Sequence, residues 1–282
     1  MLKTAGMCGL PQNREKPSII MRIYYAPLYW FFVVFLSGLF WKGRKRLARL
    51  GKRLRELERK FIVTLLVIFL CVQWGPLRDE RSNWGISRGH PFIREVALTF
   101  DDGPRAWGMP ELLAALDSID ARATFFLVGK VAERYSHLTE AIHAAGHDIE
   151  NHSFSHPNFR RLCIDGIKQE TQQFNDVIEA LDIRAPFFLR PPGGGFNLNV
   201  FRAMRSMNLR LGLWSVNTAD YTGRPAHEIV NLVVRSSRPG AIILMHSSVP
   251  ATVEALPAIA EGLRARGFRF VTLREMFNGG AI

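Results

Sequence analysis

Short apolar runs alternate with longer amphipathic stretches from residue 95 onward. The apolar runs are rich in β-branched and aromatic residues, which is typical of buried strands. Seven segments are candidate strands: Val96–Phe100, Ala123–Val128, the strand-like His147–Asn151, Phe187–Arg190, Leu211–Val216, Ala241–Met245 and Arg269–Leu273.

The stretches between these runs have the spacing of helices with one apolar face. They are Pro110–Ser118, Val131–Ala145, Asp165–Leu181, Ala226–Ser236 and Val253–Arg266. Strands that alternate with helices indicate βαβ units and a parallel sheet. The pattern therefore predicts an α/β fold, a (β/α) barrel of about seven strands that resembles a TIM barrel.

Polar residues lie at or just beyond the C-terminal ends of several predicted strands. They are Asp101, Asp102, His152, His156, Arg190, Asp220 and His246. In a (β/α) barrel these ends converge on one face, where active sites are built. Structural polar residues would not be expected to sort in this way, so we interpret the set as one site.

The pair Asp101-Asp102 is informative because adjacent residues on a strand point to opposite faces. One carboxylate can hold a metal while the other acts as a base, although Asp-Asp-Gly-Pro is also ordinary turn chemistry. His152 and His156 lie four residues apart, a spacing that lets both rings reach one ion. With Asp102 they give two nitrogens and one oxygen, the ligand count of a catalytic zinc site.

The N-terminal extension, residues 1–77, contains two uncharged and mostly apolar runs, residues 23–41 and 61–77. Both are near the lower limit of about 17–25 residues for a spanning helix. The block between them, residues 42–60, holds ten Lys/Arg and two Glu. By the positive-inside tendency this block stays cytoplasmic, which predicts that the chain beyond residue 77 lies on the extracytoplasmic side of the membrane.

The extension has three possible forms: a hairpin of two spans, a single signal anchor formed by residues 61–77, or a cleaved signal peptide. Small residues of the Ala-x-Ala kind are absent near Trp74–Arg78, which favours retention over cleavage. Residues 78–94 are polar and contain Gly85, Gly89 and Pro91, so they are predicted to be a linker before the domain of residues 95–282.

Net charge is +12, but residues 1–94 carry 18 Lys/Arg and 5 Asp/Glu, or +13, and residues 95–282 carry 19 and 20, or −1. The near-neutral domain argues against a catalytic domain that binds nucleic acid. The three cysteines lie far apart, so no disulfide framework is indicated.

Five segments in this order resemble the motifs of the polysaccharide deacetylase family, the NodB-homology domain of carbohydrate esterase family four. The resemblance covers about residues 95–277, and its segments are Thr99–Pro104, His152–His156, Arg190–Gly194, Trp214–Tyr221 and Ile243–His246. It implies a distorted (β/α) barrel and a metal-dependent deacetylase of glycans that contain N-acetylglucosamine.

The resemblance also implies a role for each residue. Asp102, His152 and His156 would bind a divalent metal, most often zinc. Asp101 would be the general base that takes a proton from the attacking water, and Arg190 would hold it ionised and oriented.

In the same resemblance His246 would be the general acid that protonates the departing amine, and Asp220 would stabilise its charged form. Three positions depart from the family pattern. Gly193 replaces an aromatic residue, Asn217 replaces an aspartate and Tyr221 replaces a tryptophan. The change at Gly193 is expected to affect packing against the sugar, and the change at Asn217 the support around the proposed acid, His246.

Two alternative functions stay open at this point. One is a deacylase or deformylase of a lipid-linked sugar, which a membrane anchor would suit. The other is an inactive domain that holds glycan at the membrane. Among polymeric substrates, peptidoglycan, poly-N-acetylglucosamine and chitin-like chains are all compatible with the sequence.

Overall fold

The computed structural model describes residues 61–64 and 85–278. The chain divides into two compact units, and residues 85–278 belong to one of them. Residues 61–64 are helical; the rest of the predicted membrane segments 23–41 and 61–77 lies outside the described residues. Within the described ranges, no helix combines the length and apolar character that crossing a membrane requires.

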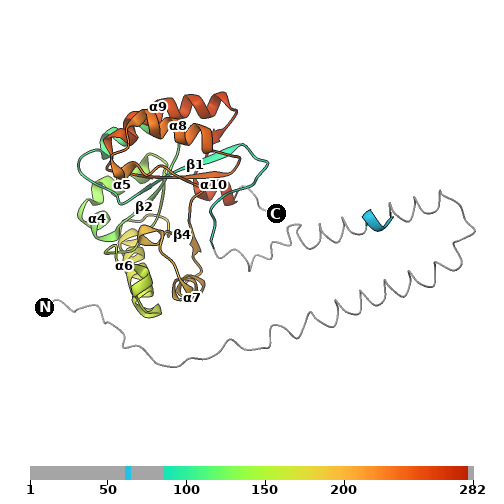
Figure 1. Ribbon diagram of the computed structural model, residues 1–282. Helices are drawn as coiled ribbons and strands as arrows, with labels where there is room; N and C mark the ends of the chain where they lie inside the picture. Colours follow the sequence, from blue (N-terminus) through green and yellow to red (C-terminus); the bar gives the residue numbers. More distant parts are fainter. Residues whose placement is uncertain (1–60, 65–84, 279–282) are drawn as a thin grey trace, which may run out of the picture. The chain divides into compact units, whose positions relative to one another are not determined.

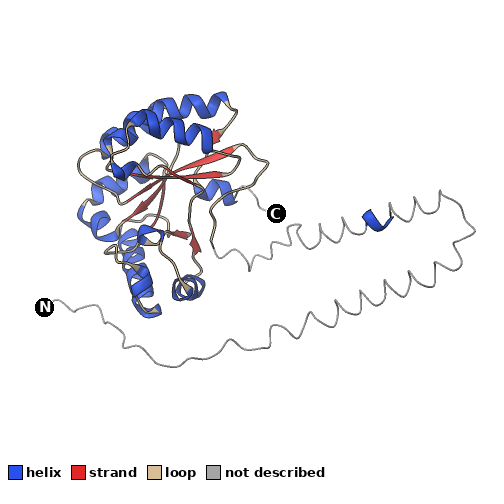
Figure 2. Cartoon of the chain, viewed as in Figure 1, coloured by secondary structure: helices blue, strands red, loops and turns tan. Residues whose placement is uncertain are grey.

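The domain is built on one parallel sheet (Figures 1 and 2). Its order is β5-β4-β3-β2-β1-β7-β6, and β8 pairs with the first residues of β1. The strands are β1 (Glu95–Asp101), β2 (Thr124–Leu127), β3 (Asp148–Asn151), β4 (Phe188–Leu189), β5 (Arg210–Leu211), β6 (Val216–Asn217), β7 (Ala241–His246) and β8 (Arg269–Phe270). This curled sheet agrees with the predicted distorted barrel.

Helices surround the sheet (Figure 2). They are α3 (Met109–Ser118), α4 (Gly129–Arg134), α5 (Ser136–Ala144), α6 (Ile164–Ala180), α7 (Leu198–Ser206), α8 (Ala226–Ser236), α9 (Pro250–Ala265) and α10 (Leu273–Asn278). The prediction of one helix over Val131–Ala145 was wrong, because Tyr135 leaves the helical conformation (φ −119°, ψ 50°) and separates α4 from α5.

The prediction of one strand over Leu211–Val216 was also wrong. The chain forms β5 at one edge of the sheet and β6 at the other, and residues 212–215 pass between them. The carbonyl groups of Gly212 and Leu213 accept hydrogen bonds from Arg190 (2.8 and 3.2 Å). The guanidinium of Arg190 therefore occupies two backbone carbonyl groups that a continuous strand would pair with its neighbour in the sheet.

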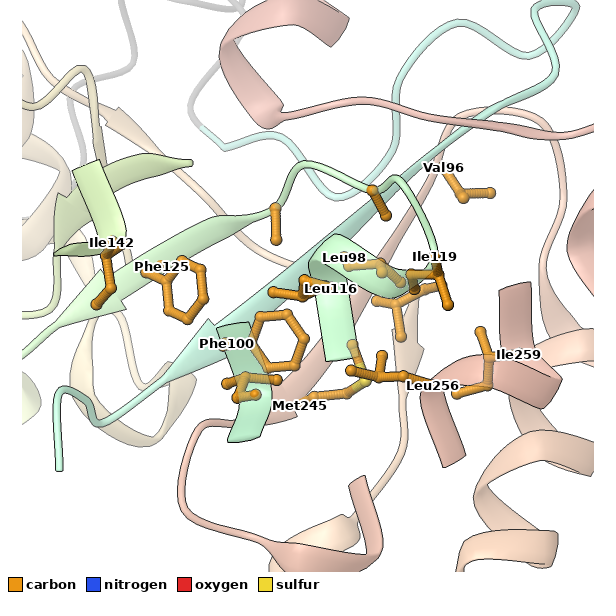
Figure 3. Close-up of a cluster of buried hydrophobic side chains, with 14 of the residues drawn as sticks. Val96, Leu98, Phe100, Leu116, Ile119, Phe125, Ile142, Met245, Leu256 and Ile259 are labelled. Atoms are coloured by element: carbon orange, nitrogen blue, oxygen red, sulfur yellow. The ribbon is translucent and has the colours of Figure 1, made fainter. Parts of the chain in front are cut away.

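The core follows the alternation of side chains along β1, which is buried throughout. Leu98 and Phe100 face outward and pack with residues of β2, β7, α3 and α9, as Figure 3 shows. Ala97 belongs to a second cluster inside the curled sheet. Thr99 and Asp101 follow Ala97 by two and four residues, so their side chains point to the same face of β1. The Asp101 carboxylate therefore points to the inside of the curled sheet.

α10 contributes Leu273 and Met276 to this inner cluster, and its Arg274 pairs with Glu150 of β3 (Nε to Oε1, 2.6 Å). Glu150 also accepts hydrogen bonds from the backbone N–H groups of Phe187 and Phe188. Burial nevertheless raises the pKa of Glu150 to about 7. This pair lies on β3 before the strand reaches His152, so it supports the fold beneath the candidate site.

Candidate active site

The first half of the site lies where β1 ends. Asp101 is the last residue of β1 and is 4% exposed. Asp102 follows with φ of 72°, in the left-handed region that aspartate tolerates better than most residues. This turn brings both carboxylates to the same end of the sheet, although they leave the strand in different directions.

Arg190, one residue beyond β4, holds Asp101. Its Nη1 donates to Asp101 Oδ1 at 2.6 Å and to Thr99 Oγ1 at 2.9 Å. The guanidinium is fully buried and lies over the ring of Phe126, 4.0 Å from the centroid. Nε and Nη2 donate to backbone carbonyl groups, so the guanidinium is held in one orientation. The guanidinium in turn fixes the orientation of the Asp101 carboxylate.

His152 comes directly after β3 and extends the ladder, because its N–H donates to Leu127 O at 3.0 Å. Its Nδ1 lies 2.7 Å from the carbonyl oxygen of Arg190. That carbonyl can only accept, so Nδ1 carries a proton, and Nε2 is the ring atom left to face Asp102 and to serve as a metal ligand. The Nε2 atom lies 3.4 Å from Asp102 Oδ1.

The loop from His152 to His156 is held in an uncommon conformation. Ser153 and His156 have φ values of 68° and 60°. Glu170 of α6 accepts hydrogen bonds from the backbone N–H groups of Phe154 (3.1 Å) and Ser155 (2.7 Å) and from the Ser155 hydroxyl. Left-handed conformations in residues other than glycine carry strain, which is found most often at functional sites. Glu170 offsets this strain and presents His156 to Asp102.

Asp102, His152 and His156 each offer one ligand atom, and these atoms lie within 4.8 Å of one another. Burial alone would raise the pKa of Asp102, but hydrogen bonds to both histidines and their charges lower it well below its usual value. The hydrogen bond to Asp102 raises the pKa of His156 against the effect of burial. Two nitrogens and one oxygen at this separation suit a divalent cation.

The second half of the site is a histidine–aspartate pair. His246 is the last residue of β7, and its Nδ1 lies 2.7 Å from Asp220 Oδ1. Asp220, in the single turn Asp220–Thr222, is 1% exposed. Its Oδ2 also accepts from the backbone N–H of His246 (2.8 Å) and from the Thr252 hydroxyl (2.6 Å).

Burial lowers the pKa of His246, but the hydrogen bond and charge of Asp220, with the charges of Asp101 and Asp102, outweigh this effect and raise it. Asp101 and His246 are direct partners in the pairing of β1 with β7. Ser247 joins the two strand ends, because its N–H and hydroxyl both donate to Asp101 O. The two halves of the site are therefore adjacent.

The three departures from the family pattern have local explanations. Asn217 Oδ1 accepts from the Ala219 N–H at 2.9 Å, so the amide supplies the acceptor that orders the turn before Asp220. The Tyr221 ring lies edge-on to His246, 5.1 Å between centroids. Gly193 has φ of 63° and no atom within 4 Å of a built Cβ, so this position leaves open space beside the site.

The seven residues predicted from the sequence all lie at one end of the sheet, as expected. His147 and His143, two further histidines in the sequence just before His152, do not lie at this end. His147 precedes β3 at the opposite end of the strand; its Nδ1 accepts from the Ala123 N–H, and burial lowers its pKa to about 4. Thr252 and Glu170 contact the site but were missed. Glu170 lies within a predicted helix, and Thr252 lies in the segment between the last motif and the predicted helix that begins at Val253.

Comparisons with known proteins agree with this geometry. A family model described as polysaccharide deacetylase matches residues 89–212. A peptidoglycan-N-acetylglucosamine deacetylase of Bacillus cereus is 38% identical over 213 residues, which are 71% of this chain and 78% of the relative.

Solved structures give the same result. A peptidoglycan N-acetylglucosamine deacetylase bound to a naphthalenyl N-hydroxybenzamide superimposes with a TM-score of 0.69 at 36% identity, over 73% of this chain and 98% of that one. A carbohydrate esterase family four pseudoenzyme from Bacillus anthracis has a TM-score of 0.65 at 32% identity, over 69% of each chain. The fold, the ordered motifs and these similarities together show that the chain belongs to the polysaccharide deacetylase family, whose enzymes are hydrolases of carbon–nitrogen bonds other than peptide bonds.

Proposed function

We propose that this protein is a metal-dependent enzyme that removes acetyl groups from N-acetylglucosamine units of an extracytoplasmic polysaccharide. One observation carries the proposal: the Asp102–His152–His156 cluster lies beside an arginine-held carboxylate, Asp101, whose neighbour across the sheet is His246. A metal site, a candidate base and a candidate acid thus meet at one end of the barrel.

The three ligand atoms fit a divalent metal of the zinc type. The carbonyl of Arg190 holds Nδ1 of His152 and leaves Nε2 to face the metal site, and Asp102 Oδ1 lies 3.4 and 3.2 Å from the two Nε2 atoms. When bound, such a metal polarises the acetyl carbonyl and favours a hydroxide-like nucleophile. Zinc is the metal we propose, because two imidazoles and one carboxylate are ligands that it prefers.

Asp101 is the proposed base, which accepts a proton from the attacking water. Arg190 neutralises the buried carboxylate and keeps the free oxygen pointed into the site. Because Arg190 touches only Asp101 and the scaffold, we assign it a positioning role.

His246 is the proposed acid, since an amine is a poor leaving group unless it gains a proton as the C–N bond breaks. Asp220 keeps Nδ1 of His246 protonated, so the proton on Nε2 is the one that His246 gives to the departing amine. The backbone N–H of Gly193 is the proposed donor to the developing oxyanion, a role that the loss of the family's aromatic side chain does not affect.

For substrate, peptidoglycan is favoured because the Bacillus cereus relative is a peptidoglycan-N-acetylglucosamine deacetylase. For location, we propose that residues 61–77 attach the chain to the cytoplasmic membrane and that the domain lies on the extracytoplasmic side. The basic block of residues 42–60 supports this orientation.

The test is acetate release by the full-length chain from peptidoglycan and from soluble N-acetylglucosamine oligomers, after metal removal and after zinc addition. We expect release only with metal. No release from a folded chain that binds zinc would contradict the proposal. Release from a lipid-linked sugar in its place would indicate the lipid-linked substrate, and retained glycan binding without any release would indicate the inactive glycan-binding function.

Glu170→Gln is expected to weaken zinc affinity about 10- to 100-fold, the usual effect of losing a group that orients a metal ligand. The amide keeps one acceptor but loses the charge that orders the N–H groups of Phe154 and Ser155. Zinc affinity is measured by competition with a chelator, and excess zinc should restore activity. Glu179→Gln, on the exposed side of the same helix, is the control. If Glu170→Gln has low activity but unchanged zinc affinity, Glu170 does not orient the metal ligand.

Asp220→Asn is expected to move the alkaline limit of kcat to lower pH. Asp220 raises the pKa of His246 and so keeps the ring protonated, hence able to act as an acid, at higher pH. Without the carboxylate, that form is lost earlier as pH rises, and activity at the optimum falls by less than about 100-fold because His246 remains. The pH profile of acetate release measures this, with Asp182→Asn at an exposed turn as control; an unmoved alkaline limit would argue against the pair.

A further inference from the structure

The end of the barrel opposite the active site carries a group of arginines and, in the turn before β1, two exposed apolar side chains. β1 runs from Glu95 at this end to Asp101 at the site, a length of about 20 Å. The group, here called the basal arginine cluster, consists of Arg88, Arg94, Arg238, Arg266 and Arg269.

Backbone and side-chain contacts tie this cluster into one surface. Arg94 Nη1 donates to Arg266 O at 2.6 Å, and Arg269 N donates to Arg94 O at 2.9 Å. Arg266 and Arg238 both donate to Ser237 O, at 3.0 and 3.1 Å. Arg88 joins them through a bridge to Ala241, the first residue of β7.

The cluster is strongly positive. Arg88, Arg94, Arg238 and Arg269 are exposed and Arg266 is half-buried. The one carboxylate among them is Glu95, which is buried and paired with Arg269. Five guanidinium groups and one carboxylate leave a net charge of +4, in a domain whose residues 85–278 carry 21 Lys/Arg and 20 Asp/Glu, or +1.

An apolar tip projects from the same place. Phe92 is 86% exposed and Ile93 is 44% exposed, in the turn that leads from Gly89 to Arg94. The turn is ordered, since Phe92 N donates to His90 Nδ1 and the two rings meet edge-on. An aromatic and an aliphatic side chain next to Arg94 and its partners match the interface of an anionic bilayer, where apolar groups enter the headgroup region and cations meet phosphates.

We propose that this basal face rests on an anionic phospholipid surface, with Phe92 and Ile93 inserted among the headgroups and the active site turned away from the membrane. The charge distribution favours that orientation, because Asp101, Asp102 and Asp220 lie at the opposite end. The proposal concerns how the domain is oriented, and its test does not depend on the proposed reaction.

Chain length supports a lipid partner. If residues 61–77 are attached to the membrane, the seven residues 78–84 reach at most about 25 Å, so the domain begins close to the headgroups. A soluble anionic glycan would use the arginines but would gain nothing from Phe92 and Ile93, which is why we favour lipid.

The experiment places an environment-sensitive fluorophore beside the tip without removing it. Full-length chain carrying Pro91→Cys, with Cys8, Cys71 and Cys163 replaced by serine, is labelled and reconstituted in nanodiscs of phosphatidylcholine with or without phosphatidylglycerol. Spin-labelled lipid is the quencher. We expect quenching in anionic discs that weakens with salt, and no quenching of the same probe at Trp107→Cys, which lies in the loop after β1 at the other end.

Variants then identify the groups responsible. Arg88 makes no side-chain hydrogen bond within the described chain, so Arg88→Gln should not perturb the fold. It should lower the ratio of docked to undocked protein about five-fold, the effect of one arginine at an anionic surface. Phe92→Ser should lower quenching as well, whereas Arg205→Gln on α7 should leave it unchanged. Acetate release from soluble oligomers should be the same in these three variants and in the labelled parent protein.

Two outcomes would overturn the proposal. One is a probe at position 91 that anionic discs quench no more than the probe at position 107. The other is a probe at position 91 that responds to a soluble polyanionic glycan in detergent but not to anionic lipid, which would assign the basal face to glycan. Loss of acetate release with normal quenching would count against the proposed reaction alone.

Discussion

Asp101→Asn should lower kcat for acetate release by about 100- to 10,000-fold, the contribution that a positioned base usually makes. Asparagine has nearly the shape of aspartate but cannot accept a proton at neutral pH. Arg190 would still find an oxygen within reach of its Nη1, so the loss should come from the missing base. The measurement is kcat and KM on soluble N-acetylglucosamine oligomers with zinc in excess.

Stability must be measured alongside activity. The guanidinium of Arg190 is fully buried, and removal of the partner of a buried charge typically costs about 3–5 kcal/mol. Thermal unfolding of the Asp101→Asn protein should therefore begin at lower temperature, and assays belong well below that transition. The bonds of Arg190 to Thr99 Oγ1 and to two carbonyl oxygens retain part of its support.

Asp102→Asn is the matched comparison, since the two carboxylates are neighbours in sequence. It should release zinc, whereas Asp101→Asn should retain it, because only Asp102 lies within 3.5 Å of both imidazoles. If Asp101→Asn keeps glycan-dependent function without acetate release, the protein serves as a glycan-binding domain. If both variants lose zinc equally, the division of roles between the carboxylates is wrong.

Sequence patterns were sufficient to locate the site because its residues follow strands. Asp101, His152, Arg190 and His246 each lie at or just beyond the end of a predicted strand, and parallel strands bring such ends together whatever the exact register. Pattern arguments depend on this regularity, so they work best where local sequence and tertiary position are coupled.

The same patterns failed where tertiary contacts decide the backbone. Nothing local in Leu211–Val216 shows that Arg190 will draw two carbonyl groups out of the ladder. Glu170 is one of several acidic residues on the polar side of a helix, and its role depends on a loop fifteen residues earlier. α7 and α10 were missed as well: α7 is nine residues long, with Val200, Ala203 and Met204 on its buried face, and α10 overlaps at Leu273 a run with strand character.

His152→Ala should abolish measurable zinc binding and lower acetate release to the background of the metal-free protein. This histidine is 2% exposed and is held from both sides, by the Arg190 carbonyl at Nδ1 and by Asp102 near Nε2. Its removal also leaves a buried carbonyl without a donor, which costs about 1–3 kcal/mol. Zinc content after dialysis and the rate of acetate release are the measurements.

His156→Ala should be the milder variant, and the contrast between the two is the sharper test. The His156 side chain is 43% exposed, so water can enter the space that it leaves and can serve as a ligand in its place. We expect weakened zinc affinity and partial recovery of activity at high zinc, which His152→Ala should not show. Equal loss in both variants, without recovery in either, would mean that the exposed histidine binds as strongly as the buried one and that the rigid support of His152 is not what sets metal affinity.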